Sequence, residues 1–77
     1  MPKYHLNLTD GIEVPDIEGQ LYESLDSAKI AATKGALELM SADVLLGKLP
    51  LSYQIEITDE EGAVMAVLRF RDLLTIE

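Results

Sequence analysis

The stretch SYQIEITDEEGAVMAVLRF, from Ser52 to Phe70, holds two segments in which apolar residues recur at every second position. A period of two is typical of β-strands that bury one face. We therefore expect strands at about residues 52–58 and 63–71, joined by a hairpin turn at residues 59–62.

The acidic residues of this turn raise the alternatives of a hairpin and a calcium loop. Placing Gly62 at the sixth position of a calcium-binding loop puts Ile57 and Leu68 at its first and twelfth positions, where oxygen ligands are needed. The spacing instead favours a hairpin that Asp59 opens and in which Gly62 adopts a left-handed backbone conformation. We expect no metal and no other cofactor.

The strand at residues 63–71 is apolar on both faces over its first half. Its inward row runs from Val64 to Phe70, and its opposite row begins with Met65 and Val67. A strand with two apolar faces is usually central in a sheet or covered by a partner.

Two further elements precede the hairpin. Residues 3–9 alternate and predict a first strand, after which residues 10–24 predict a loop with one short strand near residues 20–23. Residues 25–46 carry apolar side chains at helical spacing and predict one long helix.

The ends of this helix have recognisable signals. Ser24 or Asp26 can cap its first N–H groups, and Gly47 suits the residue that follows its last turn. Gly35 lies within the apolar face, where we expect a close approach to the sheet. Beside that face a stripe at a spacing of seven widens the apolar surface beyond the needs of one small sheet: Ile30, Leu37 and Val44.

These elements predict one α+β domain over residues 1–77, with a three-stranded antiparallel sheet and one helix packed on one face. The helix is expected to return the chain, so that strand 52–58 runs parallel to strand 3–9. Strand 63–71 would then insert between them in the order 1-3-2, a split βαβ arrangement.

Composition restricts the cellular setting and the partners. The chain has no cysteine, which excludes disulfides and thiolate sites and favours a reducing cytoplasm. The N-terminus lacks the apolar segment of a signal peptide, and no apolar run approaches the roughly 20 residues of a membrane helix. A net charge of −8 disfavours nucleic acid and anionic lipid.

Few residues suggest catalysis. His5 is the only histidine and is expected on the outer face of the first strand, near Met65 and Val67. Asp16 and Glu18 are expected as solvated loop charges, without the burial that separates the pKa values of paired catalytic carboxylates. No nucleophile, base and orienting group can be assembled, so we do not expect an enzyme.

Charged groups suggest binding instead. Arg69 and Arg71 share one face of strand 63–71, where they could grip a carboxylate or phosphate or pair with an acid such as Glu56. The acidic loop is a candidate surface for a basic partner, although solvated acidic loops are common. Its candidate residues are Asp10, Glu13, Asp16, Glu18 and Glu23, and its turns depend on Gly11 and Gly19, as the hairpin depends on Gly62.

Short motifs run through the whole chain in a fixed order. They comprise a Met-Pro-x-Tyr start, Asp-Gly after the first strand, Asp-x-x-Gly before an alanine-rich helix, and a V-x-D-x-x-G-type hairpin followed by Phe-Arg-Asp. In this order and spacing the chain resembles a family of small uncharacterised bacterial proteins, common in rhizobia and related alphaproteobacteria, that is grouped as a domain of unknown function. The resemblance implies no activity, substrate or cofactor. Its residues here are Tyr4, Asp10, Gly11, Asp16, Gly19, Ala28, Asp59, Gly62, Phe70 and Asp72.

The segment VPDIEGQLYESLDSAKIAATKGALELM, residues 14–40, is also similar to the central segment of HicB-type antitoxins. There Pro-Asp-x-x-Gly precedes an alanine-rich helix. This partial resemblance implies a small sheet with one helix, oligomerisation, and a small basic toxin as partner. The usual C-terminal DNA-binding segment is missing here, as are the cysteine and glycine that often follow the Pro-Asp motif.

We therefore expect a non-enzymatic cytoplasmic interaction module that forms a homodimer. Apolar surface left over on the helix flank and behind the sheet supports this, because large exposed apolar patches usually mark interfaces. Antitoxin-like capture of a basic protein is the alternative, and a small-ligand-binding protein or enzyme is the second alternative. The candidate interface residues are Ile30, Leu37, Val44, Met65 and Val67.

Overall fold

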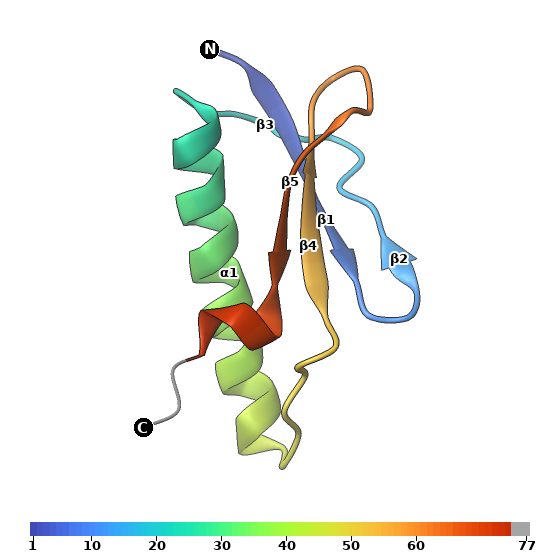
Figure 1. Ribbon diagram of the computed structural model, residues 1–77, viewed down its shortest axis with the longest axis vertical. Coiled ribbons are helices and arrows are strands. Elements are labelled where there is room, and N and C mark those ends of the chain that lie inside the picture. The colour runs from blue at the N-terminus through green and yellow to red at the C-terminus, as the bar shows by residue number, and fades with distance from the viewer. Residues whose placement is uncertain (75–77) are drawn as a thin grey trace.

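The computed structural model describes residues 1–74 and consists of one helix packed across one face of an antiparallel sheet (Figure 1). The expected α+β class with a single helix is confirmed, but the sheet has five strands instead of three. Within residues 1–74 no helix combines the length and the apolar character needed to cross a membrane. The elements are β1 (Lys3–Thr9), β2 (Glu13–Val14), β3 (Gln20–Leu21), α1 (Leu25–Leu45), β4 (Gln54–Thr58), β5 (Val64–Arg69) and the 3₁₀ helix η1 (Phe70–Leu73).

The order of the long strands differs from the expected one. β4 lies between β1 and β5, so the last long strand is at the edge of the sheet and not at its centre. β4 also pairs antiparallel with β1, with Leu6 opposite Ile57 and Leu8 opposite Ile55. The predicted order 1-3-2, the parallel relation of the first two strands and the split βαβ arrangement are therefore wrong.

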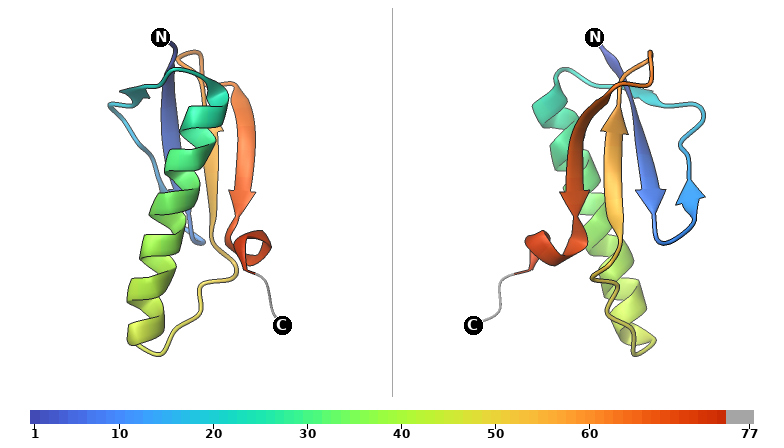
Figure 2. Two further views of the ribbon diagram at one scale, coloured as in Figure 1. Left: turned by 90° about the vertical axis from the view of Figure 1, so that its left-hand side faces the viewer. Right: turned by 45° about the vertical axis from the view of Figure 1, so that its right-hand side comes forward.

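The segment between β1 and the helix explains this difference. Residues 10–24 run back along β1, because Val14 pairs with Leu8 near the end of β1 and Leu21 pairs with Lys3 near its beginning. The helix therefore starts beside the beginning of β1 and descends alongside it (Figure 2). β4 then has to return in the opposite direction, which makes it antiparallel to β1.

Local sequence sets both ends of α1. The Ser24 hydroxyl accepts a hydrogen bond from the Ser27 N–H at 3.2 Å, so Ser24 is the N-cap. Gly47 has a φ of +80° and donates its N–H to the Val44 carbonyl, which ends the helix. Gly35 is exposed, and an added Cβ would meet nothing within 4 Å, so the close approach expected there was wrong.

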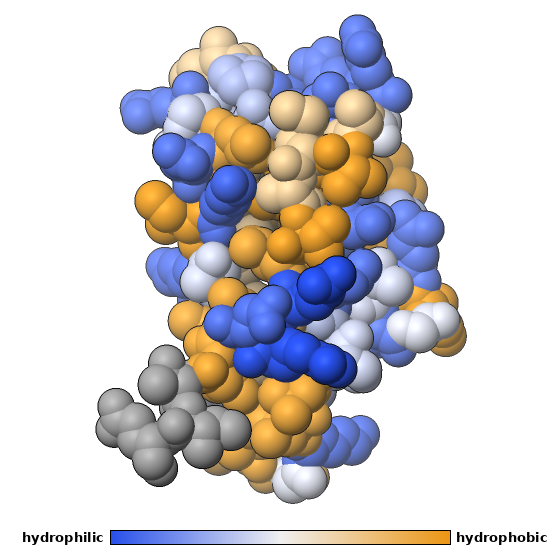
Figure 3. Space-filling view, in the orientation of Figure 1, coloured by the Kyte–Doolittle hydropathy of each residue, from blue (hydrophilic) through white to orange (hydrophobic). Residues whose placement is uncertain are grey.

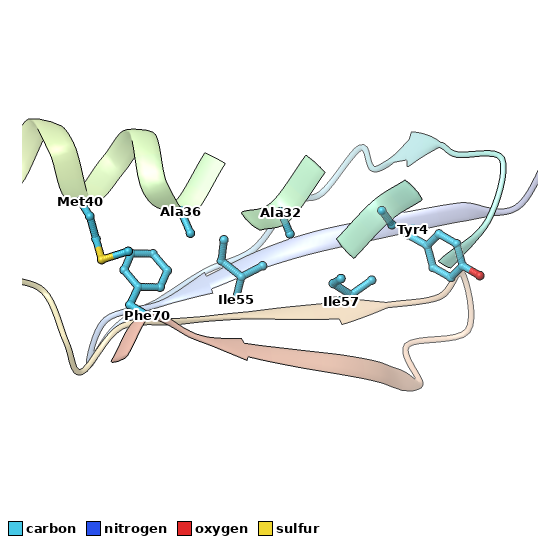
Figure 4. Packing of buried hydrophobic residues seen from close by; sticks show 8 residues of the cluster. Tyr4, Ala32, Ala36, Met40, Ile55, Ile57 and Phe70 are labelled. Carbon is cyan, nitrogen blue, oxygen red and sulfur yellow. The ribbon is translucent and has the colours of Figure 1, made fainter. Parts of the chain in front are cut away.

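The core is a thin layer between the helix and the sheet (Figure 4). Small side chains on the helix, among them Ala32 and Ala36, allow it to lie close to the fully buried Ile57. At the other end Met40 meets the ring of Phe70, which is also fully buried. Phe70 is the first residue of η1, and this short helix after β5 closes that end of the core.

The β4–β5 hairpin has the turn that its spacing favours. The Gly62 N–H donates to the Asp59 carbonyl at 3.1 Å, and Gly62 has a φ of +86°. The Asp59 carboxylate accepts hydrogen bonds from the N–H groups of Glu61 and Ala63, each at 2.9 Å. Asp59 is therefore occupied with its own turn.

Candidate functional site

The outer edge of β1 is covered along its length by the segment that follows it. β3 pairs with residues 3–4 at one end of β1, and β2 pairs with residues 8–9 at the other. Between them the Leu6 N–H donates to the Asp16 carboxylate at 3.2 Å. Asp16 thus takes the place of the strand residue that would otherwise pair with Leu6.

Asp16 also fixes the turn that follows it. The other carboxylate oxygen accepts the Gly19 N–H at 3.1 Å, and the Asp16 N–H donates to the Asn7 side-chain carbonyl at 2.8 Å. Gly19 has a φ of +68°, and a Cβ added to it would lie 2.8 Å from Cε1 of His5. A side chain at this position would be both strained and obstructed.

His5 and Asn7 belong to the same polar cluster on the outer face of β1. The Nδ1 atom of His5 forms a hydrogen bond with the Asp16 backbone oxygen. Asn7 is only 7% exposed and donates to the Thr58 hydroxyl at 3.1 Å. His5 lies opposite Thr58, with β4 separating it from β5, so the position expected for it near Met65 and Val67 is wrong.

The hydrogen bonds of this cluster tie β1 to the turn at Asp16 and to β4, which is a structural role. Tyr22 packs on the core side instead, since its N–H donates to the Pro2 carbonyl at 2.9 Å and its ring lies 6.3 Å from that of the buried Tyr4, centroid to centroid. Burial, and then the negative charge of Asp16, raise the pKa of the Tyr22 hydroxyl above its ordinary value of 10.0. Asp16 and Glu18 were both expected as solvated loop charges; Glu18 is exposed, whereas Asp16 is half-buried and hydrogen-bonded.

The other carboxylates of the acidic loop point to solvent. Asp10 accepts the Ile12 N–H at 3.2 Å in the turn at Gly11, which has a φ of +94°. The exposed acids of the loop are Asp10, Glu13, Glu18 and Glu23. Asp16 differs from them because its side chain is occupied by Leu6 and Gly19.

β5 forms the opposite edge of the sheet, and no strand among residues 1–74 pairs with its outer side. The Phe70 N–H donates to the Tyr53 carbonyl at 3.0 Å, which fixes the alternation of the hydrogen bonds between β4 and β5. Leu68 and Ala66 therefore direct their backbone groups toward β4. The N–H and C=O groups of Val67, between them, point away from the sheet.

The open edge is also apolar. Val64 is 54% exposed, Met65 44% and Val67 41%. Figure 3 shows apolar side chains gathered over this part of the molecule, with hydrophilic side chains beyond the end of the strand. The central position expected for this strand is wrong, and its two apolar faces lie at an edge.

The helix flank presents a second apolar surface. Ile30, Leu37 and Val44 are all exposed, outside the contact between helix and sheet. Ile30 and Leu37 line a shallow groove of about 580 Å³ along α1, together with Lys29 and Lys34. The five candidate interface residues therefore fall on two surfaces, one on the helix and one on β5.

A polar pocket of about 300 Å³ lies at the end of β5. Arg69 and Arg71 line it together with Ser52, Gln54 and Asp72. Arg69 lies opposite Gln54 in the sheet, whereas Arg71 belongs to η1 and not to the strand in which it was expected. Two guanidinium groups beside hydroxyl and amide groups provide a site for a carboxylate or phosphate.

Several exposed apolar residues were missed by the sequence reasoning, and Ile17 is one of them. Ile17 is 84% exposed at the tip of the turn from Asp16 to Gly19. The Asp-x-x-Gly spacing is the signal that could have located it, because an aspartate that binds the N–H three residues later projects the residues between them outward.

Comparison with known proteins identifies the family to which the chain belongs. No curated protein and no solved structure matches the chain. Residues 3–71 match the family described as "Domain of unknown function (DUF6894)". The match begins with β1 and continues past β5 into η1, so it includes both sheet edges and both arginines of the pocket. The chain therefore belongs to the DUF6894 family.

Proposed function

We propose that this chain is a non-enzymatic protein-interaction module that forms a homodimer by pairing the β5 edges of two copies. The observation that carries the proposal is the contrast between the two edges of the sheet. The β1 edge is covered by two-residue strands and by Asp16, whereas β5 has exposed apolar side chains and an outer side with which no strand of residues 1–74 pairs. Natural proteins usually protect such an edge or use it for pairing.

A second copy is the occupant that matches this edge. In an antiparallel β5–β5 pair centred on Val67, each Val67 faces its equivalent and each Met65 faces Arg69 of the other copy. The outward N–H and C=O groups of these alternate residues then bond to one another across the two-fold axis. The exposed apolar row is buried in the same step, which adds hydrophobic stabilisation.

Sedimentation analysis of wild type and two matched variants tests the proposal. Val67→Lys introduces charge on the open edge, and Val14→Lys makes the same change on β2, at the protected edge. We expect wild type and Val14→Lys to be dimers at micromolar concentration, and Val67→Lys to be a monomer with an unchanged circular dichroism spectrum. A monomeric wild type, or a dimeric Val67→Lys, would show that β5 is not the interface.

The helix flank, with Ile30, Leu37 and Val44, supplies a second candidate interface for the same module. A cytoplasmic location is also part of the proposal, and it rests on the cysteine-free composition.

The second candidate function is antitoxin-like binding of a small basic protein. The exposed acids of the loop, among them Glu13 and Glu18, favour it, because they lie beside the exposed Ile12 and Ile17. Calorimetric titration at low salt with a small basic protein encoded by a neighbouring gene tests it. Binding that is lost in Glu13→Lys/Glu18→Lys supports this function, and the absence of heat on mixing rejects it.

A further inference from the structure

We infer that Arg69 and Arg71 form a carboxylate-binding site, which in the dimer receives Glu60 and Glu61 of the second copy. This inference rests on the proposed β5–β5 pairing. It adds an electrostatic reason for the antiparallel direction of that pairing and the identity of the ligand.

The arginine side of the contact is a prepared site. The chain has only two arginines, and both line the 300 Å³ pocket at the end of β5. Both are exposed, and Ser52 and Gln54 add polar side chains on the β4 side. Asp72 supplies one carboxylate to the pocket, which leaves two guanidinium groups facing a single acid. Arginine is suited to binding carboxylates with two parallel hydrogen bonds.

The acidic side of the contact is the hairpin tip that precedes β5. Asp59 is occupied, because its carboxylate accepts two backbone hydrogen bonds within the turn. Glu60 and Glu61 are both exposed, and their side chains extend from the tip. The tip therefore presents two exposed carboxylates, the number that two guanidinium groups can pair with.

The two groups lie at opposite ends of one strand, and this selects the direction of pairing. The hairpin tip precedes Val64, and the arginine pocket surrounds Arg69 at the end of β5. Antiparallel pairing around Val67 sets the start of one β5 opposite the end of the other, so each acidic tip lies at the same end of the paired strands as the arginines of the other copy. Parallel pairing would bring the two acidic tips together. Because each chain carries a net charge of −8, local pairing of opposite charges also offsets the repulsion between copies.

Two charge-reversed variants of the full chain test this contact. One is Arg69→Glu/Arg71→Glu, and the other is Glu60→Arg/Glu61→Arg. We expect each variant alone to dimerise about tenfold or more weakly than wild type, because both ends of its homodimer bring like charges together. Mixed in equal amounts they should form a heterodimer of near wild-type affinity, because both of its ends pair opposite charges.

Lys29→Glu/Lys34→Glu is the matched control for Arg69→Glu/Arg71→Glu, since it changes the net charge by the same amount but on the helix. It should leave dimerisation near wild type. Wild-type dimerisation by both reversed variants, or no recovery on mixing, would overturn the carboxylate contact. If the carboxylate contact were overturned but Val67→Lys were monomeric, the β5 dimer would still hold. Its arginine pocket would then be available to a small carboxylate or phosphate. A monomeric wild type would overturn both the dimer and the contact.

Discussion

The carboxylate of Asp16 lies 3.2 Å from the backbone nitrogen of Leu6 and accepts the hydrogen bond that a neighbouring strand would otherwise take. One side chain thereby completes an edge that β2 and β3 leave open at its centre. The segment over residues 10–24 is held in place by this bond, and the path of this segment decides where the helix starts. The hydrogen bond between Leu6 and Asp16, which are ten positions apart, therefore helps to set the direction in which β4 runs.

Replacing Asp16 should destabilise the fold. In Asp16→Ala the N–H groups of Leu6 and Gly19 lose their acceptor, and we expect a loss of about 1–3 kcal/mol in the free energy of unfolding. Urea unfolding followed by circular dichroism measures it. Glu18→Ala removes an exposed carboxylate from the same turn and should change the free energy by less than about 0.5 kcal/mol. Equal losses in the two variants would contradict the role assigned to Asp16.

Gly19→Ala should also destabilise the fold, by about 1–3 kcal/mol, since alanine is strained at a φ of +68° and its Cβ would crowd His5. Gly11→Ala also has a positive φ but meets no atom within 4 Å, so its loss should be smaller. Combining Gly19→Ala with His5→Ala should restore part of the stability, because the ring contact disappears while the Tyr4 carbonyl stays close. A double-mutant cycle measures this coupling, and strict additivity of the two losses would argue against the steric contact.

Gly35→Ala should stabilise the protein by about 1 kcal/mol, because alanine favours the helix and its Cβ has free space at this position. The matched change Gly47→Ala should destabilise it, because Gly47 ends the helix with a φ of +80°. Thermal unfolding of both variants gives the comparison. A lower melting temperature for Gly35→Ala would mean that Gly35 has a packing role after all.

Tyr22 should contribute to the alkaline stability limit. Its pKa is raised above 10.0 in the folded protein, so unfolding favours ionisation of the hydroxyl. The contribution is complete below pH 10.0 and is lost as the pH rises through the folded-state pKa. Wild type should therefore lose stability between neutral and strongly alkaline pH more steeply than Tyr22→Phe. Urea unfolding at a series of pH values checks this, and parallel profiles would rule out a buried Tyr22 hydroxyl.

The element types were predictable from sequence, whereas their order was not. Alternation and helical spacing located the three long strands and the helix because apolar residues recur along one face of each. A short strand was expected near residues 20–23, where β3 lies, but β2 was not expected, and with two residues each neither strand shows a period that would identify its partner. Without them nothing in the sequence shows that the chain returns along β1 before the helix starts.

The candidate surfaces were predictable in part, for a related reason. The two apolar faces around Met65 and Val67 suggested either a central strand or a covered one, and composition alone cannot separate these alternatives. The position of β4 decides the matter, because β4 occupies the centre while its outward residues, such as Glu56, stay polar. The role of Asp16 escaped prediction because its partner Leu6 is not close in sequence.

The inequality of the two sheet edges sets a limit on growth. Once two chains have joined along β5, the outer edges of the combined sheet are formed by β2 and β3 of each chain, two residues long each, with the hydrogen bond from Leu6 to Asp16 between them. Such short margins offer too few backbone groups to recruit a third chain. Association through β5 would therefore stop at a closed dimer and not extend into a filament, even though the interface is apolar and lies along a strand.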